Sequence, residues 1–295
     1  MARVLNALSV DVEDWFQVQA FAGVIPRGTW DGLDRRVEAN TDRVLDLFAA
    51  AGTRATFFTL GWVAERHPGL VRRIVAAGHE LASHGFGHEL VHAIGPERFR
   101  ADISRAKAVL EDAAGIAVHG YRAPTFSIAP RIAPWAHAVL AETGHSYSSS
   151  VFPVRHDLYG APDAPRVPWR PDPNGVLELP MTTVRIGPRN LPCAGGGWFR
   201  MFPYALFRAG LARLNAQEKL RGIFYFHPWE IDPAQPRVAN APARSRLRHY
   251  SGLAGMHGKL ERLLRDFAWD RVDAVFPEVA PAPALNTAPN TVLAA

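Results

Sequence analysis

Side chains that can bind a metal or transfer protons stand at the ends of four short apolar stretches. In chain order they are Asp11, Glu13, His84, His88, Arg122 and His227. One carboxylate and two imidazoles form a common set of three protein ligands for a catalytic zinc ion, with a further position open to water. A second carboxylate can accept a proton from that water, and another histidine can protonate a leaving group. The set therefore indicates metal-assisted hydrolysis of an amide or an ester.

One overlapping motif offers a competing interpretation. Residues 88–92, with the letters HELVH, match the H-E-x-x-H helix of zinc metalloproteases, in which both histidines lie on one helix face. Gly85 and Gly87 weaken the turn before this segment, and the Gly-Pro pair at 95–96 ends a helix soon after it. The protease interpretation also gives no role to the polar residues at the other apolar stretches. We therefore expect His92 to lie beside the site without binding the metal.

Strand-like patterns alternate with helix-like patterns along most of the chain. The predicted strands are 5–10, 55–60, 80–83, 118–122, 146–151, 176–180, 223–227 and 274–276. The predicted helices are 36–51, 71–77, 96–114, 130–142, 203–215 and 253–267. Such repeated βα units predict an α/β fold with a parallel sheet, either doubly wound or closed into a barrel. Functional residues of these folds collect at the carboxyl ends of the strands, where the polar residues named above stand.

The composition is that of a globular protein with a substantial core. The chain has 295 residues, of which 48% are hydrophobic and 21% charged, and one α/β barrel typically takes about 250 residues. The net charge of +5 comes from scattered basic residues, so we expect no nucleic-acid partner. Cys193 is the only cysteine, which excludes an internal disulfide and a cysteine-rich zinc site.

The two ends and one middle segment differ from the rest of the chain in composition and in sequence pattern. The apolar stretch at 4–10 is broken by Asp11 too early for a typical signal peptide, and no stretch reaches the ~20 apolar residues of a membrane span. We therefore expect a cytoplasmic protein without a transmembrane segment. Residues 1–276 are predicted to form one domain with an irregular excursion at about 153–175, and the Pro- and Ala-rich residues 277–295 a disordered tail. No pattern indicates the oligomeric state.

Four motifs, in chain order, resemble those of the NodB-homology polysaccharide deacetylases, also called carbohydrate esterase family 4. They are SVDVEDW at 9–15, SHGFGH at 83–88, GYRAP at 120–124 and FYFHPWE at 224–230. Three further stretches are similar to a branch associated with bacterial exopolysaccharide and exosortase gene clusters. These are GGGWFR at 195–200, HPWEIDPAQPR at 227–237 and SRLRHY at 245–250. The resemblance implies a distorted (β/α) barrel, expected to have seven strands.

The resemblance also implies roles for the polar residues. By motif position, the catalytic set is Asp11 as the base, Arg122 as its partner and His227 as the general acid, and the metal ligands are Glu13, His84 and His88. The implied cofactor is one divalent ion, with zinc preferred and Co²⁺, Ni²⁺ or Fe²⁺ as alternatives. The implied reaction is removal of N-acetyl groups from hexosamine residues of an exopolysaccharide or its lipid-linked precursor.

The sequence departs from the family pattern at two places. Val12 separates Asp11 from Glu13, whereas the common first motif has adjacent carboxylates. Alternate residues of a strand share a face, so both carboxylates can point into one site, and Asp14 is kept as an alternate ligand. Ser148 stands where relatives often carry an aspartate, which leaves a role for the fifth strand open.

Substrate contacts are less clearly marked. The candidates are Pro124, Arg200, Trp229 and Glu230, although Trp229 and Phe199 are more typical of packing than of sugar platforms. Five other histidines are interpreted as structural: His67, His119, His137, His145 and His156. Two alternatives stay open, a small-molecule amidohydrolase on the same barrel and a glycan-binding module that has lost turnover.

Overall fold

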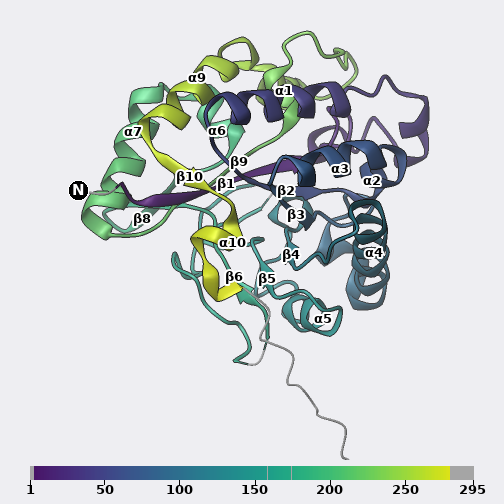
Figure 1. The fold of residues 1–295 in the computed structure, drawn as a ribbon, viewed down its shortest axis with the longest axis horizontal. Helices are drawn as coiled ribbons and strands as arrows, with labels where there is room; N and C mark the ends of the chain where they lie inside the picture. The colour runs from purple at the N-terminus through teal and green to yellow at the C-terminus, as the bar shows by residue number, and fades with distance from the viewer. Residues whose placement is uncertain (1–2, 158, 174, 280–295) are drawn as a thin grey trace, which may run out of the picture.

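The computed structural model, which describes residues 3–157, 159–173 and 175–279, is built around one curled parallel sheet (Figure 1). Its strands are β1 (Leu5–Val12), β2 (Thr56–Thr59), β3 (Glu80–Ser83), β4 (Gly120–Tyr121), β5 (Tyr147–Ser148), β6 (Leu177–Glu178), β9 (Ile223–Phe226) and β10 (Ala268–Asp270). The strands β1 to β6 pair in sequence order, and β9 pairs with β1. These seven strands form the distorted (β/α) barrel that the sequence predicts. The eighth, β10, pairs with the first three residues of β1.

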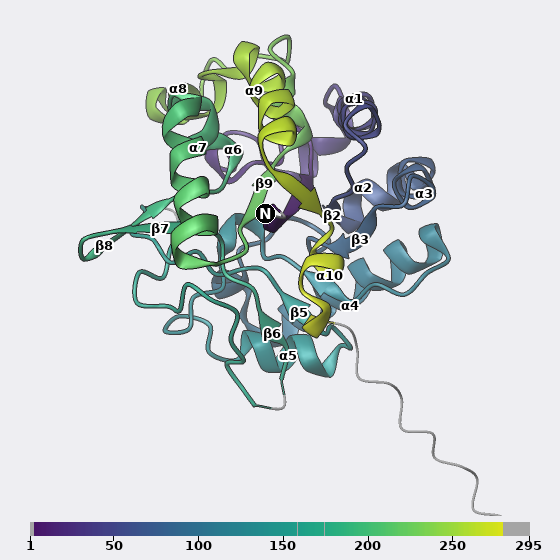
Figure 2. The same cartoon turned by 60° about the vertical axis from the view of Figure 1, so that its left-hand side comes forward.

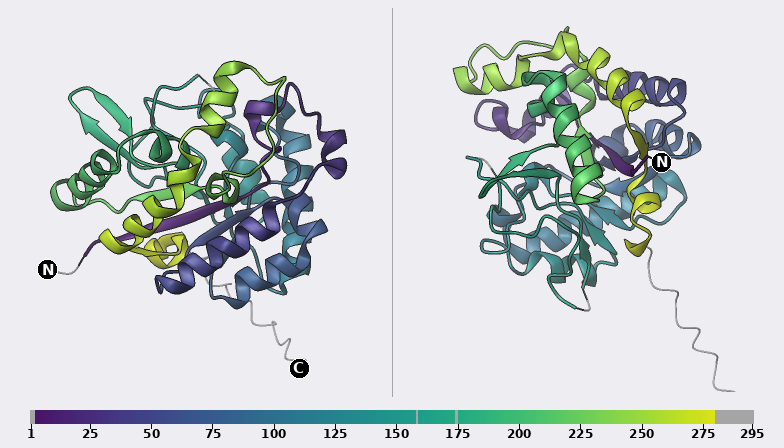
Figure 3. Two further views of the ribbon diagram at one scale, coloured as in Figure 1. Left: turned by 90° about the horizontal axis from the view of Figure 1, so that it is seen from above. Right: turned by 90° about the vertical axis from the view of Figure 1, so that its left-hand side faces the viewer.

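Helices cover the outside of the curled sheet (Figure 2). The longer ones are α1 (Val37–Ala50), α3 (Pro68–Ala76), α4 (Val91–Ala114), α7 (Tyr204–Arg213) and α9 (Leu253–Asp266). The shorter ones are α2 (Gly61–Arg66), α5 (Ala136–Glu142), α6 (Gly196–Met201), α8 (Ala243–Tyr250) and α10 (Val272–Val275). A separate antiparallel hairpin of β7 (Thr183–Ile186) and β8 (Arg189–Pro192) projects at one side (Figure 3).

The two faces of β1 decide which of its side chains can do chemistry. Leu8, Val10 and Val12 belong to the core cluster that includes the apolar residues of α1 and α9. Ala7 belongs to the cluster inside the curl, together with aromatic residues of β2, β5 and β9. Because side chains alternate along a strand, Asp11 shares the inner face with Ala7. The chain thus places a carboxylate inside the barrel where the strand ends.

Two predictions near the carboxyl end are wrong. Residues 274–276, predicted as a strand, lie in and beyond the short helix α10. A run of only three apolar residues is too short to show whether its period is that of a strand or of a helix. The last strand of the structure is β10, which forms by pairing with β1 at the opposite end of the chain. Pro277–Val279, assigned to the disordered tail, form a 3-10 turn with Val279 buried. The rest of that tail, 280–295, lies outside the described residues.

The excursion predicted at 153–175 contains no helix at its described positions. One of its residues, Trp169, forms an isolated β-bridge with Glu178. Among the residues that the structure describes, no helix combines the length and apolarity needed to cross a membrane.

His145 is a buried histidine of the packed scaffold. Its ring lies 5.7 Å from that of Tyr121, and its Nδ1 lies 3.0 Å from Thr143 Oγ1. Its Nε2 has no hydrogen-bond partner among the described residues. Burial and the positive charge of Lys107 lower the pKa of His145 to about 3. The folded protein therefore keeps this ring neutral.

Replacing His145 with Phe is expected to make the fold less sensitive to acid. Below about pH 6.5 the unfolded chain binds a proton at His145, whereas the folded chain does not until about pH 3, so this residue lowers stability as the pH falls through that window. Between pH 7.5 and 5, we expect His145→Phe to lose about 1–2 kcal/mol less free energy of unfolding than the unmodified protein. Urea unfolding with a chelator present measures the difference, and His257→Phe, at a half-buried histidine on α9, is the control. Equal losses would show that the folded state accepts the proton.

Candidate active site

Asp11 faces the interior of the curled sheet, where it meets Arg122 at the end of β4. Arg122 Nη1 donates to Asp11 Oδ1 at 2.6 Å and to Ser9 Oγ at 2.8 Å. Its Nε donates to the Ser149 carbonyl at 3.0 Å, and the guanidinium carbon lies 4.0 Å from the centre of the Phe58 ring. The arginine is 0% exposed. The orientation of the Asp11 carboxylate is therefore fixed by a fully buried cation.

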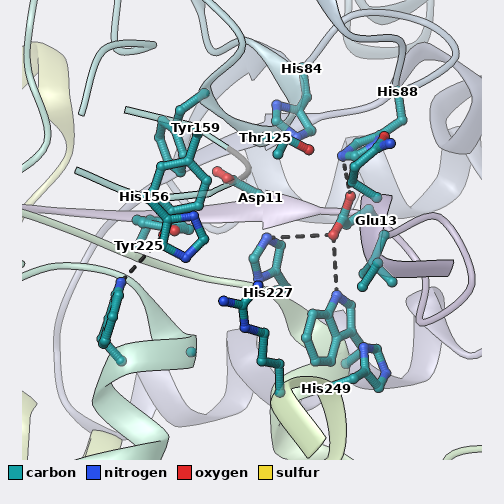
Figure 4. A pocket seen from close by; sticks show the side chains of 18 of the residues that line it. Asp11, Glu13, His84, His88, Thr125, His156, Tyr159, Tyr225, His227 and His249 are labelled. Carbon is teal, nitrogen blue, oxygen red and sulfur yellow. Dashed lines mark hydrogen bonds and ion pairs between the residues drawn. The ribbon is translucent and has the colours of Figure 1, made fainter. Parts of the chain in front are cut away.

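Glu13, His84 and His88 converge beside Asp11 (Figure 4). They offer ligand atoms that all lie within 4.8 Å of one another, and all three residues are buried. Glu13 Oε2 has no hydrogen-bond partner among the described residues but lies 2.9 Å from His88 Nε2. His84 Nδ1 donates to the carbonyl of Arg122 at 2.9 Å, which leaves its Nε2 as the ligand atom. The cluster therefore fits one divalent metal ion.

The electrostatics of this cluster suit metal binding. Burial opposes ionisation of Glu13, but the positive charges of His88 and His227 outweigh it and lower the pKa of Glu13 to about 2. Burial also lowers the pKa of His84 to about 4, against the opposing charge of Asp11. A metal ligand set needs an ionised carboxylate and a neutral imidazole. Near neutral pH, Glu13 meets the first condition and His84 the second without the ion.

The loop that carries the two histidines is held in an unusual backbone conformation. Gly85 has φ 74° and His88 has φ 51°, both in the left-handed region. Asp102 of α4 accepts a hydrogen bond from the Phe86 N–H at 2.8 Å, and Arg27 donates to the His88 carbonyl at 2.7 Å. A non-glycine residue with positive φ is strained and persists only where its surroundings hold it. These contacts thus hold the His88 side chain beside Glu13.

The backbone of His88 also removes the metalloprotease interpretation. The helix α4 begins at Val91, so His88 lies before it, in the left-handed region, while His92 lies within its first turn. His92 Nδ1 lies 3.2 Å from the Ser127 carbonyl. The two histidines of the H-E-x-x-H match therefore do not share a helix face, and the expectation that His92 is a neighbour without a ligand role agrees with this geometry.

Asp14, the alternate ligand, accepts hydrogen bonds from backbone N–H groups with both of its carboxylate oxygens. Its Oδ2 accepts from the N–H groups of Arg36 and Val37 at 2.8 and 3.0 Å, at the start of α1. Its Oδ1 accepts from the Trp15 N–H at 2.9 Å. The structure thus places Asp14 as a cap that joins β1 to α1, outside the ligand group of Glu13.

His227, at the end of β9, lies between two carboxylates. Its Nε2 is 3.4 Å from Glu13 Oε1, and its Nδ1 is 3.1 Å from Glu230 Oε2. Burial disfavours the charged ring, but Glu13 and Glu230 outweigh it and raise the pKa of His227 to about 9. Glu230 is held in turn by Arg200, whose Nε donates to Glu230 Oε1 at 2.8 Å. The geometry supports a protonated His227 facing the cluster.

The contacts of Glu230 bear on the departure at Ser148. Ser148 Oγ donates to Ser150 Oγ at 2.8 Å and is fully buried. No carboxylate reaches His227 from this strand. Glu230, three residues after the histidine, supplies one instead. We infer that Glu230 and Arg200, predicted as substrate contacts, instead position the His227 ring: Glu230 contacts its Nδ1, and Arg200 holds Glu230.

A cavity of about 210 Å³ opens over the cluster. Besides Asp11, Glu13, His84, His88 and His227, half of its lining residues have aromatic rings: Phe126, His156, Tyr159, Trp198, Tyr225, Trp229 and His249. His156 stacks on Tyr159 with ring centroids 4.0 Å apart. Sequence reasoning interpreted His156 as structural and missed Tyr159, because both come from the irregular excursion, which has no periodic pattern. Two sequence motifs contain residues of this wall: GGGWFR contains Trp198, and HPWE contains Trp229.

The remaining predicted contacts differ in placement. Trp229 lines the cavity, and its Nε1 donates to Glu13 Oε1 at 3.2 Å. Pro124, Glu230 and Arg200 are buried and are not among the described lining residues, whereas Thr125, next to Pro124, is. His67, His119, His137 and His145 also lie away from this cavity.

Two neighbouring substitutions separate the metal ligand from the cap. Glu13→Gln removes a ligand charge, so we expect it to lose stoichiometric metal while the fold stays intact. Asp14→Ala leaves three backbone N–H groups without their acceptor, so we expect it to lower the free energy of unfolding by about 2–3 kcal/mol and keep the metal. Elemental analysis after dialysis and urea unfolding measure both. Metal loss in Asp14→Ala alone would reverse the assignment.

Two family models match the chain, one after the other. Residues 29–146 match the family described as polysaccharide deacetylase, and residues 149–277 match a domain of unknown function (DUF3473). The two matches meet next to β5, so strands of one sheet come from both. His84, His88 and Arg122 lie in the first match and His227 in the second, while Asp11 and Glu13 precede both.

Two curated relatives agree with the match to the polysaccharide deacetylase family. Over 147 residues the chain is 31% identical to the chitooligosaccharide deacetylase of Sinorhizobium fredii, covering 50% of this chain and 62% of that one. Over 96 residues it is 31% identical to a peptidoglycan-N-acetylglucosamine deacetylase of Bacillus cereus, covering 32% and 35%. The chain thus matches less than two thirds of these relatives' length.

A Mycobacterium smegmatis protein, provisionally named a polysaccharide deacetylase, has the same fold. The TM-score is 0.59 at 19% identity, and the superposition covers 95% of this chain and 91% of the other. The match at residues 29–146 thus identifies a NodB-homology polysaccharide deacetylase domain in this chain, and a segment of unknown function contributes strands to the same sheet.

Proposed function

We propose that the protein is a metal-dependent deacetylase that hydrolyses N-acetyl groups on hexosamine residues of an exopolysaccharide or its lipid-linked precursor. The observation that carries the proposal is the convergence, in one cavity, of a buried Asp–Arg pair, a Glu-His-His cluster and a histidine backed by a carboxylate. The relatives named above act on chitooligosaccharide and peptidoglycan, which supports a glycan substrate over a small cyclic amide. The presence of base, acid and ligand cluster together counts against a module that only binds glycans.

Glu13, His84 and His88 would hold the metal ion, and zinc suits this ligand set best. A divalent ion there supplies Lewis acidity, which makes water nucleophilic near neutral pH and polarises the acetamide carbonyl. Asp11, Glu13, His84 and His88 are themselves buried, which strengthens the electrostatic interactions among them.

The chain's own residues move the protons. Asp11, oriented by Arg122, accepts a proton from the water that attacks the carbonyl carbon. His227 carries a proton on Nε2 and donates it to the nitrogen as the C–N bond breaks. The products are acetate and a free amine on the sugar. The second product gains a positive charge at neutral pH.

We also propose that residues 1–276 act as one catalytic unit. The strands β1 to β4 precede the second family match, whereas β6, β9 and β10 lie within it, and all belong to one sheet. The base, Asp11, therefore comes from the residues before both matched segments, and the acid, His227, from the second.

Acetate release from N-acetylated glycan oligomers is the direct test. We expect release from at least one N-acetylhexosamine oligomer, loss of release with a chelator, and its return on adding Zn²⁺. Turnover of a cyclic ureide, with none of any N-acetyl sugar, would instead assign the protein to small-molecule amide hydrolysis. Acetate release unaffected by exhaustive metal removal would contradict the metal-dependent mechanism.

The separate roles of Asp11 and His227 can be distinguished with two kinds of substrate. Asp11→Asn is expected to lower kcat by about 10²–10⁴ for both an N-acetyl sugar and an aryl acetate, because both need the attacking water. His227→Ala should lower kcat by a similar factor for the amide but much less for the aryl ester, whose leaving group needs little protonation.

Glu230→Gln is the matched test of the positioning contact. It should show the same amide-selective loss as His227→Ala, to a smaller degree. Metal content serves as the control in all three variants. Equal losses on both substrates for His227→Ala would remove His227 from the acid role, and metal loss in Asp11→Asn would make Asp11 a ligand.

A further inference from the structure

Large apolar side chains are exposed on the hairpin β7–β8, on α7 and α8, and where α6 ends. Leu247 of α8 is 68% exposed and Leu206 of α7 is 64% exposed, more than any other large apolar residue that the structure describes. Ile186, Leu191, Met201 and Phe202 are exposed as well. Figure 2 shows the elements that carry these residues on one side of the molecule. Apolar side chains gathered on a surface mark a site that contacts a partner or a membrane.

Contacts between these elements join them into one surface, which we call the α7 face. Val184 of β7 is buried, and β7 packs against α7. Leu191 pairs with Val184 across the hairpin and Ile186 lies two residues further along β7, so both stand on the side of the hairpin that faces α7. Arg200 of α6 donates to the carbonyl of Arg248 in α8 at 3.3 Å. The hairpin, α6, α7 and α8 are therefore adjoining parts of the same face.

The α7 face is also the basic part of the protein. Residues 179–217, which contain the hairpin, α6 and α7, include five arginines and no aspartate or glutamate. Residues 233–260, which contain α8, include four arginines, Lys259 and again no acidic residue. Outside these two stretches the chain has more acidic than basic residues, so the net positive charge of the protein arises here. The arginines whose side chains are exposed are Arg185, Arg189, Arg208, Arg213, Arg244 and Arg246.

Exposed apolar side chains between arginines fit the surface of a membrane that contains anionic lipids. Apolar side chains enter the boundary between head groups and acyl chains, and basic side chains are attracted to the negative head groups. A nucleic acid would match the charge but would leave Leu206 and Leu247 in water. A neutral protein surface would cover the leucines but would not balance the arginines. The combination therefore favours an anionic membrane over either of these partners.

We propose that the α7 face docks on the surface of a membrane that contains anionic lipids. The face borders the catalytic cavity, because Met201 belongs to both and Trp198, which lines the cavity, stacks on Phe202 with ring centroids 5.6 Å apart. Docking thus brings the cavity close to the lipid head groups, where a glycan carried by a lipid is presented. The inference goes beyond the function proposed above, since docking needs no turnover, and it favours the lipid-linked precursor as the substrate.

Two double variants at exposed positions test the apolar and the basic contribution separately. Leu206→Ser with Leu247→Ser removes the two most exposed apolar side chains of the α7 face. Arg213→Gln with Arg246→Gln removes two of its positive charges. None of these four residues lines the catalytic cavity, so turnover of a soluble aryl acetate and metal content should stay unchanged.

Matched controls make the same changes elsewhere on the surface. Ile116→Ser with Ile132→Ser replaces exposed apolar residues outside the α7 face. Arg43→Gln with Arg72→Gln removes exposed charges from α1 and α3, which cover another part of the sheet. The controls show whether binding depends on this face or only on the overall charge and hydrophobicity of the protein.

Binding is measured by co-sedimentation of the metal-loaded protein with vesicles of phosphatidylcholine alone and of an equal mixture of phosphatidylcholine and phosphatidylglycerol. We expect binding to the anionic vesicles, much weaker binding to the neutral ones, and a decrease as salt is added, because salt screens the charges. Each double variant of the α7 face should weaken binding to anionic vesicles about tenfold. Both control variants should bind as the unmodified protein does.

Several results would overturn the proposal. They are no binding to anionic vesicles, equal binding to both kinds of vesicle, and equal losses in the face variants and their controls. A dimer in analytical ultracentrifugation that Leu206→Ser with Leu247→Ser abolishes, without any vesicle binding, would assign the face to a second copy of the chain. Failure of the proposed function is a separate result, the absence of acetate release from soluble N-acetylated oligomers, and it leaves vesicle binding measurable.

Discussion

Arg122 and Asp11 form an ion pair inside the curled sheet, where both side chains are almost completely removed from water. Burying two charges is unfavourable by several kcal/mol per ion unless the pair is close and the remaining polar atoms are satisfied. Here the other guanidinium donors reach Ser9 and Ser149, and the flat face of the guanidinium covers Phe58. Such a buried ion pair is weak evidence that the fold is stable, but it strongly restricts the positions of the elements that carry the two residues. It requires β1, β4 and the chain after β5 to keep one mutual register.

A second set of charges is arranged around Glu13. This carboxylate faces His88, His227 and the Trp229 N–H, whereas Asp11 faces Arg122. Each carboxylate thus has its own cation, although the two are separated by a single residue of the chain. With His227 between Glu13 and Glu230, the proton on that ring is stabilised from both sides. Asp11 and His227, proposed above as base and acid, therefore have separate charged partners.

Much of this arrangement follows from local sequence patterns. Asp11, the two histidines of the SHGFGH loop and His227 stand at the ends of predicted strands, and parallel strands bring such ends to one edge. The alternation along β1 explains why Asp11 and not Val12 faces inward. The partner of His227 and the wall of the cavity were not predictable in this way. Glu230 resembles a surface carboxylate until Arg200 is placed beside it, and His156 and Tyr159 come from a segment without periodicity. The strand β10 depends in the same way on a distant partner.

The segment of unknown function has a physical task in this fold. It supplies His227 and Glu230, and also Arg200, whose Nη1 donates to the His249 carbonyl at 3.0 Å near the end of α8. His249 stacks on Trp229 with ring centroids 4.2 Å apart, and Trp229 Nε1 donates to Glu13 Oε1. The helices α6 and α8 and the turn after β9 are therefore tied together through buried polar contacts that end at the metal cluster. The first matched segment carries His84, His88 and Arg122, whereas His227, proposed above as the general acid, comes from the segment of unknown function. The residues before the first match, which carry Asp11 and Glu13, and the two matched segments thus all contribute to a single cavity.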